Sequence, residues 1–125
     1  MKIKTSELQG AALDWVVTIL VAKAEGYPDF VLDTKHFLKM HILGEPLNYD
    51  YSTWWAQGGP IIERERIGFK FSGDFGFCAW KSYGMGPHQN EHSQYGPTPL
   101  IAAMRCYVAS KLGDEVEVPD ELVRR

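Results

Sequence analysis

Two histidines and a glutamate stand in a spacing that could bind zinc. His88, Glu91 and His92 satisfy the H-x-x-E-H pattern of the inverted zinc peptidases. That chemistry needs both histidines on adjacent turns of one rigid helix, with a third ligand well downstream. Here glycines and prolines surround the motif, and the downstream carboxylates lie in or near the C-terminal tail. A metal-dependent hydrolase is therefore the remote hypothesis, and a solvated polar loop is favoured.

Two tryptophans and two arginines could bind a nucleotide or a single-stranded nucleic acid. Trp54 and Trp55 offer indole faces for stacking on bases, and the guanidinium groups of Arg64 and Arg66 could pair with phosphates. Two glutamates alternate with these arginines and cancel their field. Tryptophans beside a Gly-Gly pair also commonly pin a turn to the core. Nucleotide or nucleic-acid binding is therefore the second hypothesis.

The spacing of the other reactive residues gives no further catalytic motif. The stretch Gly84-Met-Gly-Pro87 lacks the lysine and the strand-to-helix context of a phosphate loop. The serines, cysteines and histidines do not show the sequence spacing of a Ser-His-Asp or Cys-His catalytic set. Cys78 and Cys106 lie in a predicted strand and a predicted helix without Cys-x-x-Cys spacing. We expect free, mostly buried thiols and no cofactor. The missing motifs favour a protein that is not an enzyme but leave an enzyme open.

The composition predicts one compact domain, 1–125, that needs neither metal nor disulfide. Of its 125 residues, 45% are hydrophobic and 13% are aromatic, which is enough for a core. The net charge is −3, so no general basic field attracts a phosphate backbone. No cleavable apolar segment follows the start, and the most apolar run, 15–24, is too short and polar to span a bilayer. We expect a cytoplasmic protein that does not enter membranes.

A helix is predicted over about 7–24 near the N-terminus. Ser6-Glu-Leu-Gln9 fits a capping box, in which the serine and glutamine side chains satisfy backbone N–H groups at the start of a helix. Gly26 and Pro28 end the pattern. Most of its circumference is apolar, which indicates a largely buried helix.

A second helix is predicted over about 99–112. Thr98 can cap it, Pro99 fits the first helical position, and Gly113 can end it. Opposite its apolar stripe the side chains are small rather than charged, at Ala102, Ala103, Cys106, Ala109 and Ser110. Small residues permit close approach of backbones, so we expect this face to be covered by the first helix or by a second copy in a homodimer.

A β-hairpin is predicted over about 67–81. Ile67-Gly-Phe-Lys-Phe71 alternates with period two, a Ser-Gly-Asp turn follows, and Phe75 to Trp80 forms the returning strand. The remaining segments are short or irregular: a strand at 30–32, a loop over 36–48, helical turns at 52–56 and 60–64 around a Gly58-Gly59 break, an exposed loop over 84–97, and a docked or frayed tail from about 114. The whole indicates an α+β fold in which the two helices cover one face of a small antiparallel sheet built on the hairpin.

Two stretches resemble a phage family. Trp55-Ala-Gln-Gly-Gly-Pro-Ile-Ile-Glu-Arg-Glu65 and the segment from Pro99 to Gly113, which begins Pro-Leu-Ile-Ala-Ala-Met-Arg, resemble the phage and prophage NinX-like family of uncharacterised proteins. The resemblance covers most of the chain. It implies a temperate-phage accessory protein of the bacterial cytoplasm, and it carries over no activity or catalytic residue. The leading hypothesis is therefore a non-enzymatic interaction protein that acts on a host or phage macromolecule.

Overall fold

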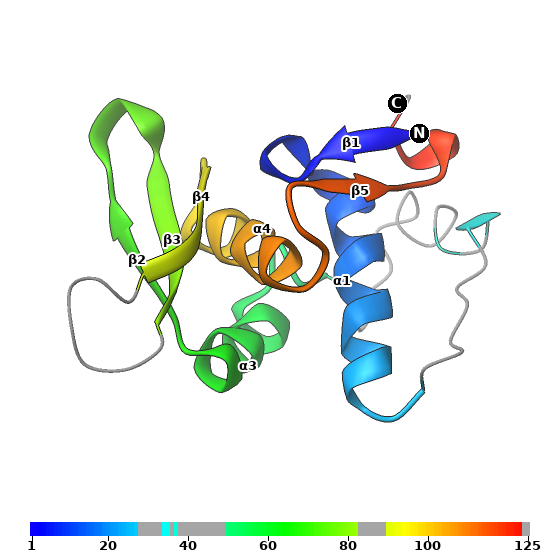
Figure 1. Ribbon diagram of the computed structural model, residues 1–125, viewed down its shortest axis with the longest axis horizontal. Coiled ribbons are helices and arrows are strands. Elements are labelled where there is room, and N and C mark those ends of the chain that lie inside the picture. Colours follow the sequence, from blue (N-terminus) through cyan, green and yellow to red (C-terminus); the bar gives the residue numbers. More distant parts are fainter. Residues whose placement is uncertain (28–33, 36, 38–49, 83–89, 124–125) are drawn as a thin grey trace.

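The structure is a computed structural model that describes residues 1–27, 34–35, 37, 50–82 and 90–123. Figure 1 shows its elements: helices α1 (Gly10–Ala24), α3 (Trp55–Glu65) and α4 (Pro99–Leu112); strands β1 (Lys2–Lys4), β2 (Ile67–Phe71), β3 (Phe77–Ser82), β4 (Asn90–Gly96) and β5 (Glu115–Glu117); and 3-10 turns η1 (Thr5–Glu7), η2 (Gly73–Phe75) and η3 (Asp120–Leu122). Helices combined with two small antiparallel sheets confirm the predicted α+β class. The predicted strand at 30–32 and most of the loop at 36–48 lie outside the described residues.

The larger sheet has the strand order β2-β3-β4. The predicted hairpin is confirmed: β2 and β3 pair antiparallel, from Ile67 opposite Lys81 to Phe71 opposite Phe77. The predicted loop at 84–97 is wrong over 90–96, because this polar segment forms β4. Hydrogen bonds to β3 satisfy backbone N–H and C=O groups of this segment. The stabilisation from these bonds outweighs the weak strand propensity of its residues.

Helix α4 lies between the larger sheet and α1 (Figure 1). Every residue from Ala102 to Ala109 is buried, which includes nearly all of the small-residue side. The predicted covering of this face is therefore confirmed, and it comes from within the same chain. The expectation that both helices cover the sheet is wrong for α1, which packs mainly on α4. A homodimer stays untested; the exposed end of α4 is Lys111 and Leu112.

The contact between β4 and α4 requires glycine. A Cβ atom added at Gly96 would lie 2.7 Å from the backbone nitrogen of Ala102. The ends of α4 also follow the sequence: the Thr98 hydroxyl accepts a hydrogen bond from the Ile101 N–H at 3.1 Å, and Gly113 has a positive φ of 88°. Local signals and packing therefore agree along this helix.

The predicted start of the first helix is wrong. The segment 5–7 is a 3-10 turn, and α1 begins at Gly10 without a side-chain cap. Tertiary bonds hold the segment instead: the Thr5 hydroxyl donates to the Gly113 carbonyl at 2.7 Å, and the Thr5 N–H donates to the Asp114 carbonyl at 2.8 Å. These bonds to the end of α4 replace the capping box.

The two-stranded sheet joins β1 to β5, so the tail is docked rather than frayed. Lys2 and Lys4 lie opposite Glu117 and Glu115, and opposite charges across two strands stabilise their pairing. Between these pairs, Val116 turns inward and is buried. The complementary Lys-Ile-Lys and Glu-Val-Glu patterns were the sequence signal for this sheet.

Helix α3 continues through Gly58-Gly59-Pro60, so the predicted break is wrong. The proline lacks a backbone N–H and removes one helical hydrogen bond, whereas the first glycine has a packing role. A Cβ atom at Gly58 would lie 2.5 Å from both the Tyr51 carbonyl oxygen and Leu100 Cδ2. Glycine therefore allows α3 to approach α4 closely.

The adjacent glycines predict opposite effects of one substitution. Gly58→Ala should lower the free energy of unfolding by about 2 kcal/mol, because the methyl group overlaps a backbone oxygen. Gly59→Ala should raise it by about 0.5 kcal/mol, because the nearest atom is 4.0 Å away and alanine favours the helix. Urea unfolding followed by tryptophan fluorescence measures both. Changes in the free energy of unfolding that have the same sign and size in the two variants would contradict this packing.

Candidate functional site

The tryptophans and arginines predicted to bind nucleotides lie at opposite ends of α3. Trp54 and Trp55 are about half exposed at its start, whereas Arg64 lies in its last turn. Arg64 follows Trp55 by nine positions, which is roughly 13 Å along a helix axis. Arg66 adopts a positive φ of 55° after the helix, and its carbonyl accepts from the Ser82 N–H. The structure does not gather these side chains into one site, and nucleotide binding here stays a prediction.

Arg64 belongs to an ion cluster centred on Glu65. The Glu65 carboxylate accepts hydrogen bonds from Lys81 at 2.8 Å and from Arg64 at 3.2 Å, and it pairs with Lys111 at 3.3 Å. Burial alone would raise the pKa of Glu65, but the hydrogen bonds and charges of these cations lower it to about 2. The cluster joins α3, β3 and α4, and Arg64 also donates to the Tyr107 hydroxyl at 3.4 Å. Its geometry indicates a structural role.

The zinc motif does not form a helix where the structure describes it. Glu91 and His92 lie on β4, and His92 has a φ of 57° at the point where the β3–β4 register shifts. An extra residue with positive φ is typical of a β-bulge. No three metal-binding side chains gather among the described residues. His88 lies outside them, so the metal hypothesis stays untested.

Four aromatic side chains, Trp55, Phe69, Phe71 and Phe77, form what we call the aromatic strip. The Trp55 and Phe69 ring centroids are 5.8 Å apart, and those of Phe71 and Phe77 are 5.5 Å apart in an edge arrangement. Phe69 and Phe71 are alternate residues of β2 and therefore point to the same face. The strip runs from the start of α3 along an edge strand to the turn of the hairpin.

Three rings of the aromatic strip are more exposed than core residues. Trp55 is 51% exposed, Phe69 is 38% and Phe71 is 68%. The hairpin projects beyond α4 (Figure 1), so its outer rings extend past the helix that buries the rest of this face. The alternating pattern of β2 showed that one face is apolar. It could not show where the covering helix ends, which is why the sequence missed this surface.

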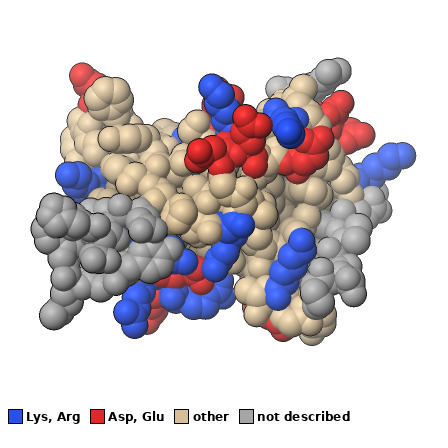
Figure 2. All heavy atoms as spheres, viewed as in Figure 1, with Lys and Arg blue, Asp and Glu red and all other residues tan. Residues whose placement is uncertain are grey.

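The charges on the surface are mixed. Figure 2 shows lysines and arginines interspersed with acidic residues, and a largely uncharged area at upper left, over the hairpin. Lys70 lies between Phe69 and Phe71 in β2 and therefore points to the opposite face. None of the helices that the structure describes is long and apolar enough to cross a membrane.

These features define a small α+β protein with an apolar, aromatic surface on a projecting hairpin. The family follows from comparison with known proteins: the family model described as Bacteriophage P22, NinX matches residues 4–111, and the chain belongs to this family. The resemblance noted in the sequence is confirmed, and the protein is a phage protein. A comparison with curated proteins found no match.

The ion cluster predicts a pH-dependent stability. Because the folded pKa of Glu65 lies below the ordinary value of 4.5, its stabilisation is complete above that value and is lost as the pH falls towards 2. Glu65→Gln should lower the free energy of unfolding by about 1–2 kcal/mol at neutral pH, a range reduced for solvent screening of the exposed partners. The difference from wild type should disappear near pH 2.

Urea unfolding across this pH range measures the effect. Glu63→Gln is the matched control, because Glu63 is exposed on the same helix and makes no ion pair with another described residue. It should change stability by less than about 0.5 kcal/mol. A loss in Glu65→Gln that does not depend on pH would contradict the cluster.

Proposed function

We propose that the protein is a non-enzymatic interaction protein that docks onto another protein, of the host or the phage, through the aromatic strip. The observation that supports this proposal is the arrangement of the strip. Two ring contacts, Trp55 with Phe69 and Phe71 with Phe77, are linked by the shared face of Phe69 and Phe71 on the edge strand β2, and three of the four rings are more than a third exposed. Water around such rings is released when a partner covers them, and aromatic residues are enriched in protein interfaces. Membership of a phage family supports a setting in the bacterial cytoplasm.

A protein partner fits this surface better than a nucleic acid. Bases could stack on the rings, but a strand also needs cations along its backbone. Lys70 points away from the strip, and Arg64 is engaged with Glu65 and Tyr107. The net charge of −3 adds no attraction for phosphates. Nucleic-acid binding therefore remains the second candidate.

Two phenylalanines of the same hairpin give a matched test. Phe71 is 68% exposed in the aromatic strip, whereas Phe75 is 74% exposed and contacts Tyr95 instead. The test uses three tagged proteins, the wild type and the variants Phe71→Ala and Phe75→Ala. Each is used to capture partners from a nuclease-treated lysate of lysogenic cells. We expect one protein that wild type and Phe75→Ala retain and that Phe71→Ala loses by about tenfold, because a buried aromatic anchor contributes about 1–2 kcal/mol or more.

Salt and molecular mass separate the alternatives. Docking through apolar rings should survive a wash at about 500 mM salt, whereas phosphate contacts weaken steeply as salt rises. Retained nucleic acid that is lost at high salt would favour the second candidate. A dimer of purified protein that Phe71→Ala dissociates would instead assign the strip to a second copy. Identical captured sets for all three proteins would contradict the proposal.

A further inference from the structure

Arg105 is a buried cation that has no acidic partner among the residues that the structure describes. Its side chain leaves α4 and is only 9% exposed. Nε donates to the Leu8 carbonyl at 2.7 Å, and Nη1 donates to the Tyr95 carbonyl at 2.8 Å. Within the described residues, no carboxylate lies at ion-pair distance from it. Burial lowers the pKa of the guanidinium, as expected for a charge removed from water without a counter-ion.

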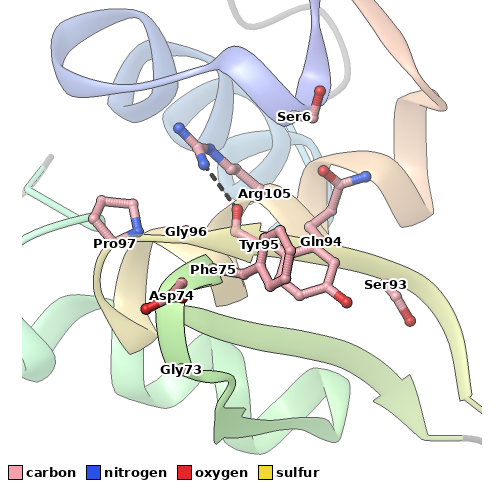
Figure 3. Close-up of a pocket in the computed structure, with 11 residues that line it drawn as sticks. Ser6, Gly73, Asp74, Phe75, Ser93, Gln94, Tyr95, Gly96, Pro97 and Arg105 are labelled. Carbon is pink, nitrogen blue, oxygen red and sulfur yellow. Dashed lines mark hydrogen bonds between the residues drawn. The ribbon is translucent and has the colours of Figure 1, made fainter.

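The guanidinium borders a cavity of the described residues. This open cavity of about 670 Å³ lies between η1, the hairpin turn and β4, and Figure 3 shows the residues that line it. A guanidinium carries five N–H donors in a fixed fork. The two carbonyls use two of them, and the other three have no partner among the described residues. An oxyanion is the ligand that such a fork binds best.

Gln94 supplies a second, independent observation. Its side-chain Oε1 is buried and has no hydrogen-bond partner in the part of the chain that the structure describes. Gln94 lines the same cavity as Arg105, together with the hydroxyl-bearing residues Ser6 and Ser93. Buried polar atoms are normally paired, and an unpaired one at a cavity indicates a place for a ligand. An amide can present either its oxygen or its NH₂ group to that ligand.

Two aromatic residues also line the cavity, across the edge strand β4 from Gln94, because Tyr95 follows Gln94 and consecutive side chains of a strand point to opposite faces. Phe75 and Tyr95 are 74% and 51% exposed, and their ring centroids are 5.8 Å apart with a tilt of 54°. Figure 3 shows these rings together, with the Tyr95 carbonyl bonded to Arg105. Flat rings pack well on such a pair. Asp74 also lines the cavity, and its negative charge disfavours ligands that carry several anionic groups.

We propose that this cavity binds a small molecule that carries one oxyanion, a carboxylate or a phosphate, next to a flat ring. The free N–H donors of Arg105 and the NH₂ group of Gln94, whose amide turns over to donate in place of the unpaired Oε1, hold the oxyanion. The ring packs on Phe75 and Tyr95. The site is separate from the aromatic strip: it uses the turn and β4 rather than β2 and α3. Ligand binding therefore does not depend on the proposed protein partner.

Nuclear magnetic resonance titration of the full chain tests the proposal. The probes are phenyl phosphate and benzoate, with phenol as the uncharged control. We expect one of the two anions to bind with a dissociation constant on the order of 1 mM, given its size. The Arg105 Nε–H signal and the amide signals of 93–96 should shift in wild type, and phenol should bind at least about tenfold more weakly. The tighter anion identifies the ligand as a carboxylate or a phosphate.

Three variants keep the test independent of folding. Phe75→Ala should weaken binding about fivefold, whereas Phe71→Ala should leave it unchanged, because Phe71 is similarly exposed but belongs to the other surface. Asp74→Asn should tighten binding about twofold, because it removes a like charge, and a gain cannot arise from unfolding.

Three results would overturn the site. The first is that neither anion shifts these signals. The second is that phenol binds as tightly as the anions, and the third is that Asp74→Asn binds the anion with unchanged or weaker affinity. The same variants separate this proposal from the interaction surface: Phe71→Ala affects the partner alone, and Phe75→Ala affects the ligand alone.

Discussion

The complete burial of α4 is the constraint on which the rest of the structure depends. Every residue from Ala102 to Ala109 is enclosed, so the helix needs a neighbour on each side. The larger sheet, α1 and α3 supply them. Such close packing is feasible only where backbones can approach, and this explains why small residues occupy α4 and why Gly58 and Gly96 face it without a side chain.

Buried polar groups then fix how the surrounding segments sit on this helix. Arg105 binds carbonyls of the N-terminal segment and of β4, which are far apart in sequence. Asp14 of α1 is buried and accepts a hydrogen bond from the Ser52 N–H at 2.8 Å, which holds the segment before α3. A buried charge that loses its partners is costly, so these bonds favour one arrangement of the elements over its alternatives.

The solvent-exposed surfaces of the sheet are those that α4 does not cover. The hairpin is longer than the helix contact, and its outer rings therefore reach solvent as the aromatic strip. At the other edge of the sheet, the turn and β4 enclose the cavity beside Arg105. A phage protein of this size thus presents two chemically different surfaces on one short sheet. Neither uses the predicted zinc motif or brings Trp55 close to Arg64.

The sequence by itself determined the α+β class, the hairpin and the caps of α4, because local propensity, turn chemistry and alternation encode them at short range. It also indicated the family, through the resemblance of two stretches of the chain. Only the tertiary structure decided that 90–96 is a strand, that α3 continues through its glycines, and that a Thr5 bond replaces the capping box. It also decided which apolar rings are exposed and that Arg105 is buried with its guanidinium bonded to backbone carbonyls. These features depend on contacts between residues distant in sequence, which no local pattern records.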